Sequence, residues 1–181
     1  MNNKNVIDFR FLSKNEYKDE NYTNWSRMYE YPLIIQKIKE TSKDTPLIHN
    51  TACGFAPIHE KFAKDLDKIS NCIHSDILTD SPIQQQYYDL ISEKKEFKNK
   101  FDYVLNISTL EHIKNLEIQI LKNLYKQVKP NGYLLCTFDY PTVDLTKIEK
   151  FLNKKCQDVS DRLTNDMLKL NIILLTIQKK Q

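Results

Sequence analysis

The segment of residues 101–113 constrains the fold more than any other part of the chain. It begins with an apolar run from Tyr103 to Ile107, which Asn106 alone interrupts and which contains aromatic and β-branched residues. Such a run is typical of a strand that helices cover on both faces. Polar and titratable residues follow it directly. Because doubly wound α/β sheets bind ligands at the carboxyl ends of their strands, this polar bend is a candidate site. Ordinary loop polarity with a helix cap is the alternative interpretation.

A βαβ unit is predicted from the residues that follow. Apolar residues recur at helical spacing from Ile113 to Val128, which predicts an amphipathic helix packed on the sheet. The helix is expected to end at residues 129–132, Lys-Pro-Asn-Gly, because proline cannot continue a helix and Asn-Gly favours a left-handed turn. Residues 133–138 are again apolar and aromatic, and they predict the next parallel strand.

Taken together, the segments FDYVLNISTLEHI and LYKQVKPNGYLLCTFDYP resemble the fourth-strand and fifth-strand region of class I S-adenosylmethionine-dependent methyltransferases. In that family a Phe-Asp pair opens strand four, and a Lys-Pro-Gly-Gly-like turn leads into strand five; here Asn131 stands where glycine is commoner. The resemblance covers about residues 47–179. It implies a single-domain, doubly wound α/β fold with a mostly parallel seven-stranded sheet and an antiparallel last strand. It also implies S-adenosyl-L-methionine as the cofactor.

The family's first motif, an acidic residue followed by three alternating glycines, corresponds to the turn around Gly54. Asn50 replaces the acid, Ala52 and Ala56 replace two glycines, and only Gly54 remains. Alanine in the left-handed region costs about 1–2 kcal/mol, so the loop is expected to be wider than usual or to bind the cofactor more weakly. The amino end of the next helix would favour the cofactor's carboxylate. A simple strand-to-helix turn is the alternative.

Asp76 is the candidate ribose-binding acid. It ends a short predicted strand, residues 72–76, about 20 positions after Gly54, which is the spacing that one intervening helix and one strand require. An aspartate at this place is also a common turn residue. The resemblance offers Asp89 as the acid that meets the adenine amine. However, residues 81–91 carry helical spacing, which favours an exposed helix face for Asp89.

The predicted site residues share a place at the carboxyl ends of the predicted strands or in the segment before them. The cofactor-contacting set is Asn50, Ala52, Cys53, Gly54, Asp76, Ile77, Asn106 and Ser108. His112 is the predicted catalytic base, because histidine titrates near neutral pH; capping its helix is the alternative role. The predicted substrate-contacting set is Arg27, Tyr29, Glu111, Asp139 and Tyr140.

Residues 1–44 are predicted to form a helical or lid segment ahead of a Rossmann-like methyltransferase domain at residues 45–181. Residues 25–32 concentrate aromatic side chains and an arginine before a helical stretch. In methyltransferases of this size such a segment often completes the substrate pocket, so Arg27 is predicted to clamp an anionic acceptor. Alternatively, the aromatic residues cover an exposed sheet edge and Arg27 pairs with Glu30 on the surface.

The end of the chain is similar to the closing antiparallel hairpin of the family. The pattern predicts a helix at residues 144–153, a weak strand at residues 156–161 and a strong strand at residues 170–178. With 181 residues and 40% hydrophobic content, the chain is expected to form one domain with its own core.

Charge and cysteine content exclude several classes of protein. The net charge is +3, from 27 basic and 24 acidic residues interspersed along the chain, which does not favour a nucleic-acid partner. No apolar run approaches the roughly 20 residues of a membrane helix. The four cysteines form no C-x-x-C pair and are expected to be reduced in a cytoplasmic protein. No two histidines have the i, i+4 spacing with an intervening acid that is typical of zinc sites, so no metal is predicted.

Methyl transfer to a small acceptor is the predicted function, with oxygen favoured over nitrogen as the accepting atom. The segments WSRMYEYP and TFDYP resemble those of small methyltransferases of bacterial surface-polysaccharide synthesis, which implies a sugar, a sugar nucleotide or a phosphate-bearing precursor. Two alternatives remain. The altered glycine loop is compatible with a binding or regulatory module without turnover. A nicotinamide-dependent oxidoreductase is less favoured, because the loop lacks G-x-G-x-x-G spacing.

Overall fold

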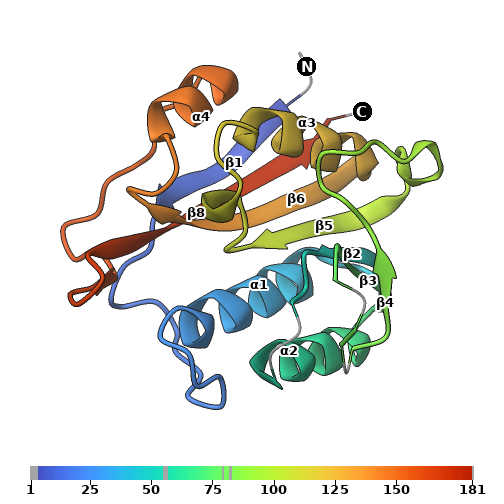
Figure 1. Ribbon diagram of the computed structural model, residues 1–181, viewed down its shortest axis with the longest axis horizontal. Helices are drawn as coiled ribbons and strands as arrows, with labels where there is room; N and C mark the ends of the chain where they lie inside the picture. Colours follow the sequence, from blue (N-terminus) through green and yellow to red (C-terminus); the bar gives the residue numbers. More distant parts are fainter. Residues whose placement is uncertain (1–3, 55–56, 79, 82, 181) are drawn as a thin grey trace.

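The computed structural model describes residues 4–54, 57–78, 80–81 and 83–180. A central sheet lies between two layers of helices, with α1 and α2 on one face and α3 and α4 on the other (Figure 1). The strands are β1 (Lys4–Phe11), β2 (Leu47–Thr51), β3 (Asn71–Asp76), β4 (Gln85–Tyr87), β5 (Phe101–Ile107), β6 (Val128–Tyr140), β7 (Thr164–Asn165) and β8 (Leu170–Lys179). The helices are α1 (Arg27–Thr41), α2 (Pro57–Asp67), α3 (Glu117–Gln127) and α4 (Leu145–Leu152), with short 3₁₀ turns η1 (Lys95–Phe97) and η2 (Leu110–His112).

The sheet has the order β1-β8-β6-β5-β2-β3-β4, and the two-residue β7 pairs with β8. The five strands from β4 to β6 in this order are parallel, whereas β8 runs antiparallel to β6. The predicted doubly wound, mostly parallel sheet with an antiparallel last strand is therefore confirmed. The described residues form eight strands instead of the predicted seven, because β1 and β7 were not foreseen and the predicted strand at residues 156–161 does not form.

The outer strand beside β8 comes from the start of the chain. In β1, Phe9 and Phe11 are buried and alternate with the charged Asp8 and Arg10, the pattern of a half-buried edge strand. The predicted strand at residues 156–161 is wrong. That segment, poor in apolar residues, forms only a bridge to β1 through Gln157, which exchanges backbone hydrogen bonds with Phe9 and Phe11 at 2.9 and 3.0 Å.

Alternate residues of the central strands supply two cores. Val104 and Leu134 pack under α3, whereas Leu105 and Leu135 pack against α1 and α2 on the opposite face. This two-sided burial explains the unbroken apolar runs in the sequence. The first turn of α1 lies at the carboxyl end of β5, because Ser108, which follows that strand, donates a hydrogen bond to Glu30.

Two predicted helices differ from the structure. α3 begins at Glu117 and not at Ile113, because the 3₁₀ turn η2 and the left-handed residue Asn115 (φ 65°) come between strand and helix. The predicted helix at residues 81–91 is wrong. Residues 85–87 form β4 instead, whose pairing with β3 overrides the local helical spacing; Pro82, its predicted start, lies outside the described residues. In the described ranges, no helix has the length and apolar character to cross a membrane.

Candidate functional site

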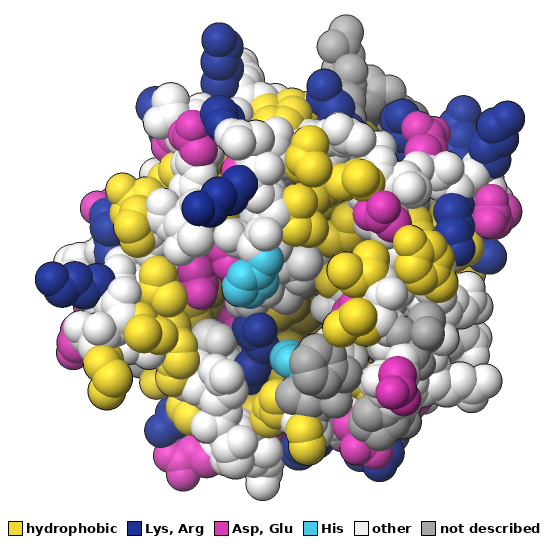
Figure 2. Space-filling view, in the orientation of Figure 1, with side chains coloured by type: hydrophobic (Ala, Val, Ile, Leu, Met, Phe, Trp, Pro, Cys, Tyr) yellow, Lys and Arg dark blue, Asp and Glu magenta, His cyan; other side chains and the backbone are white. Residues whose placement is uncertain are grey.

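A cavity of about 570 Å³ lies at the carboxyl ends of β2, β3 and β5 and is bordered by α1, α2 and the bend after β5. Figure 2 shows the corresponding hollow near the centre of the view, with hydrophobic, basic and histidine side chains around it. The turn around Gly54 and the polar bend after β5 both line it, as predicted. The lining residues that the argument uses are Arg27, Tyr31, Asn50, Ala52, Cys53, Gly54, His59, Asp76, Ile77, Asp89, Ser108 and His112.

The loop after β2 turns sharply beneath the cavity. Ala52 and Gly54 both have positive φ, 49° and 73°. A Cβ atom at position 54 would lie 2.6 Å from Cδ2 of His59, so only glycine fits there without a shift of that ring. Ala52 therefore occupies the left-handed region that the family gives to glycine. Ala56, the other replaced glycine, lies outside the described residues.

The carboxylate of Asp76 ties this loop to the end of β3. Its two oxygens accept hydrogen bonds from the backbone N–H groups of Gly54 at 2.9 Å and Leu78 at 3.0 Å. Ionised carboxylate oxygens can accept further bonds, so Asp76 retains acceptor capacity toward the cavity. The next residue, Ile77, lines the cavity and is half exposed.

Asp89 lies at the cavity and not on a helix. It follows β4, and its Oδ1 accepts a hydrogen bond from the N–H of Ile91 at 3.0 Å. Tyr88, Leu90 and Ile91 line the cavity beside it. The structure is therefore compatible with Asp89 as the acid near the adenine and not with the favoured interpretation, an exposed helix face. The reason is that β4 brings this segment to the carboxyl edge of the sheet.

The bend after β5 brings together some of the predicted residues and not others. Ser108 (φ 44°) and His112 line the cavity. Asn106 does not: it is fully buried beneath the bend, where its Nδ2 donates to Thr51 Oγ1 at 3.1 Å. Asn50 lines the cavity, and its amide nitrogen lies 3.2 Å from Nδ1 of His74.

The first turn of α1 places a buried ion pair at the ends of β5 and β6. The carboxylate of Glu30 is fully buried and accepts hydrogen bonds from Arg27, from Thr137 and, at 2.7 Å, from Ser108. Burial alone would oppose ionisation, but the Arg27 charge and the hydroxyl donors hold the pKa of Glu30 below its ordinary value. The surface pair between Arg27 and Glu30 considered from the sequence is therefore wrong, since the pair is buried.

Two more acids lie beside Glu30, behind the wall of the cavity. Burial, together with the charges of Asp139 and Glu30, raises the pKa of Glu111 to about 8. Burial and the Glu30 charge raise the pKa of Asp139 to about 6. Glu111 Oε2 and Asp139 Oδ1 have no hydrogen-bond partner among the described residues. Buried acids with open acceptor atoms are characteristic of functional sites.

Of the five residues predicted to contact substrate, Arg27 lines the cavity, whereas Tyr29, Glu111, Asp139 and Tyr140 do not. Tyr29 packs against the core under α1, and the ring of Tyr140 packs edge-on against Phe11 with centroids 5.4 Å apart.

The structure adds residues that the sequence did not indicate: Glu30 and Tyr31 from α1 and His59 from α2. The hydroxyl of Tyr31 hydrogen-bonds Nδ1 of His59 across the cavity wall. Of these residues, only Glu30 had a local signal in the sequence, namely its position three residues after Arg27, which allows an ion pair on a helix.

The chain belongs to a family of methyltransferases. The sequence profile described as "Methyltransferase domain" matches residues 42–167, and membership defines the chain as an enzyme that uses S-adenosylmethionine. No curated protein matches the chain significantly in sequence.

Solved structures share the fold. The 1,6-didemethyltoxoflavin-N1-methyltransferase of Burkholderia thailandensis, with 1,6-didemethyltoxoflavin and S-adenosylhomocysteine bound, is 12% identical with a TM-score of 0.60, over 90% of this chain and 82% of that one. The N-methyltransferase NodS of Bradyrhizobium japonicum WM9 is 11% identical with a TM-score of 0.62, over 87% and 97%. The [4+2]-cyclase SpnF is 13% identical with a TM-score of 0.60, over 96% and 87%. At these identities the likeness concerns the fold alone.

The cavity fits the family's cofactor. Its volume is within the range of about 300–1,000 Å³ for small-molecule sites. Nε of Arg27, a residue on the cavity wall, is a buried donor without a partner among the described residues. Donors, carboxylate acceptors and apolar surface thus converge on one space large enough for a nucleoside with an amino-acid tail.

Proposed function

We propose that this protein transfers the methyl group of S-adenosylmethionine to an oxygen of a small hydroxyl-bearing acceptor, such as a sugar, a sugar nucleotide or another polysaccharide precursor. The observation that carries the proposal is the single cavity that the Gly54 turn and the bend after β5 share. It brings a nucleotide-type turn to the same strand-end edge as a cluster of buried acids.

In this proposal the cofactor supplies an electrophilic methyl group, and the chain binds and orients both partners. The backbone from Ala52 to Gly54 would support the amino-acid portion, with the N–H of Arg27 Nε as a donor to its carboxylate or to an anionic group of the acceptor. Asp76 would accept from the ribose hydroxyls and Asp89 from the adenine amine. Orientation of this kind can supply about 7–11 kcal/mol of barrier reduction.

His112 remains our proposal for the base, because it lines the cavity at the bend where an acceptor would approach. Glu111 and Asp139 lie behind that wall with open acceptor atoms. Because they do not line the cavity, we expect them to influence the acceptor through the charges of Arg27 and Glu30 and not by direct contact.

Calorimetry with S-adenosylmethionine, followed by mass spectrometry of an acceptor panel, tests the proposal. The panel contains free sugars, sugar nucleotides and amine-bearing analogues of equal size. We expect micromolar or tighter cofactor binding, a gain of one methyl on a hydroxyl-bearing acceptor, and a rate about 10²–10⁴-fold lower in His112→Asn with unchanged cofactor affinity. Methylation of the amines alone would overturn oxygen transfer, and an unchanged rate in His112→Asn would remove the base role.

A binding module without turnover is the second candidate. It is favoured by Ala52, which holds a left-handed conformation at φ 49° where the family uses glycine. Tight cofactor binding with no product from any acceptor in the panel would support it, whereas methyl transfer to any acceptor would exclude it.

A further inference from the structure

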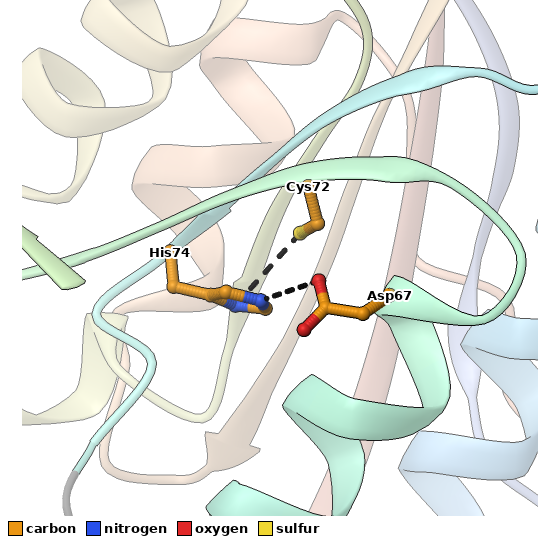
Figure 3. A group of neighbouring side chains, drawn as sticks. All are labelled: Asp67, Cys72 and His74. Atoms are coloured by element: carbon orange, nitrogen blue, oxygen red, sulfur yellow. Dashed lines mark hydrogen bonds and ion pairs between the residues drawn. The ribbon is translucent and has the colours of Figure 1, made fainter. Parts of the chain in front are cut away.

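A second cavity, of about 550 Å³, lies between α2 and β3 and is lined by different residues from the cofactor cavity. Asp67, Cys72 and His74 converge on it, and Figure 3 shows their side chains pointing toward one another from the end of α2 and from β3. One ligand-type atom from each residue lies within 4.8 Å of the other two.

The local fold explains why these three residues meet. Cys72 and His74 are two positions apart in β3, so both side chains lie on the face of the sheet that packs against α2. Asp67 is the last residue of α2, and its carboxylate lies 3.1 Å from Nε2 of His74. His74 is buried, whereas the side chain of Asp67 is 55% exposed, which leaves an ion a path from solvent.

The donor set matches a borderline-soft divalent metal. A thiolate, an imidazole and a carboxylate are all zinc ligands, and thiolate with imidazole selects zinc over magnesium or calcium. With Zn–S near 2.3 Å and Zn–N near 2.0–2.1 Å, tetrahedral ligand atoms lie roughly 3.3–3.8 Å apart. The Sγ atom of Cys72 lies 3.8 Å from Nδ1 of His74, whereas the Asp67 carboxylate lies nearest to Nε2, the other ring nitrogen. Because an ion binds one of these nitrogens, the exposed Asp67 side chain must turn toward Nδ1 for all three residues to share it.

We propose that Asp67, Cys72 and His74 bind Zn²⁺, with a fourth position open to the cavity for water or for Glu60, which also lines it. Lys64 lines the cavity too, but its ammonium donates to Glu60 at 2.6 Å, so its charge is balanced. The ion would fasten the end of α2 to β3. The helix α2 begins just after the Gly54 turn, and β3 ends at Asp76, the candidate ribose-binding acid. An ion bound between them would therefore stabilise the loop from a position outside the cofactor cavity.

Cobalt substitution of the chelator-treated full chain tests the site under reducing conditions. We expect one Co²⁺ per chain, a thiolate-to-cobalt charge-transfer band, displacement of that band by one equivalent of Zn²⁺, and a higher melting temperature with zinc. Cys72→Ser should abolish the band. Asp67→Asn, at an exposed position that tolerates substitution, should weaken zinc binding by more than about 10-fold, since loss of an outer-shell partner alone costs about 10–100-fold.

Cys156→Ser is the matched control, because Cys156 is likewise a free, partly exposed cysteine but lies far along the chain from this cluster. It should keep the band, the stoichiometry and the zinc-dependent melting shift. The proposal is overturned if the wild type shows no charge-transfer band, or if Cys72→Ser binds zinc as tightly as the wild type. Neither outcome depends on S-adenosylmethionine, so the result stands apart from the proposed methyl transfer.

Discussion

The two sides of the cofactor cavity are built in different ways. The loop half, which consists of Ala52, Gly54 and Asp76, is made of backbone turns tied together by one carboxylate. The acidic half, which consists of Glu30, Glu111 and Asp139, does not line the cavity itself; these carboxyl groups lie in the interior beside Arg27, which does line it. The loop half needs only small conformational free energies, whereas the acidic half requires the desolvation of three carboxyl groups.

This difference teaches where function and stability are coupled. Turns such as the loop half stabilise themselves by backbone hydrogen bonds, so their residues can change with modest effect. In the cluster of buried acids, neighbouring groups have pKa shifts of opposite direction. The pKa of Glu30 is lowered, which favours its charged form, and that of Glu111 is raised, which favours its neutral form. Such divergent shifts are typical of sites that handle protons or polar substrates.

The largest effect is expected from Glu30→Ala. The substitution leaves the guanidinium of Arg27 buried without its partner, and the loss of one member of a buried pair costs about 3–5 kcal/mol. Urea denaturation measures the change in the free energy of unfolding. Glu93→Ala, which breaks an exposed pair with Lys126, is the control and should cost less than about 1 kcal/mol. Equal losses in the two variants would mean that the buried Arg27–Glu30 pair costs no more to break than an exposed pair.

The second prediction concerns the pH dependence of stability. Because the folded-state pKa of Glu111 is raised to about 8, its contribution to stability is fully present below its unfolded pKa of about 4.5 and is lost as the pH rises through 8. The free energy of unfolding should therefore fall between pH 7 and 8, by at most about 1.4 kcal/mol per pH unit. In Glu111→Gln this slope should disappear.

The window of pH 7 to 8 isolates Glu111 from its neighbours. Asp139 acts with the same sign but only up to about pH 6. Burial lowers the pKa of His49 to about 4 and that of His59 below its ordinary value, so their contributions grow with pH and are complete near the unfolded value of 6.5. Denaturation of wild type and Glu111→Gln at both pH values is the measurement. Parallel slopes would show that Glu111 is ionised well below pH 7.

The loop half could be predicted from the sequence, because its determinants are local. A strand, a glycine, a helix and an acid at the required spacing indicated Gly54 and Asp76, and the structure places both on the cavity. The fold class followed from the same local patterns, in particular from the apolar runs of β5 and β6. The alternation of residues 8–11 in β1 was overlooked among polar neighbours, so this strand was not predicted.

The acidic half could not be predicted in the same way. Glu30 reaches Ser108 and Thr137 across a separation of 78 and 107 residues, and no local pattern encodes that contact. The spacing of Arg27 and Glu30 equally suits an exposed helical pair. The prediction that Asn106 contacts the cofactor was wrong for a related reason. A residue at the end of a strand can point into the interior beneath the bend that follows, as Asn106 does. Likewise β4 gains its strand conformation by pairing with β3, against its own helical spacing.

The third prediction tests whether Asp76 serves the cofactor as well as the loop. Asp76→Ala should weaken S-adenosylmethionine binding by about 1.5–3 kcal/mol, the value of hydrogen bonds to a charged group. Asp76→Asn retains one carbonyl acceptor for the N–H groups of Gly54 or Leu78 and should lose less folding stability than the alanine variant. Calorimetry and urea denaturation of both variants separate the roles. An unchanged cofactor affinity in both would leave Asp76 with the loop alone.

The smallest effect is expected from Ala52→Gly. At φ 49° alanine bears about 1–2 kcal/mol of left-handed strain, and glycine removes it while adding about 0.5–1 kcal/mol of unfolded-state entropy. The variant should therefore be more stable by about 0–1.5 kcal/mol in urea denaturation. Ala63→Gly is the matched control, because Ala63 is buried within α2 and should lose stability by about 1 kcal/mol or more. If both glycines destabilise the protein alike, the loop half holds no strain at Ala52, and the departure from the family's glycine motif has no energetic cost at that position.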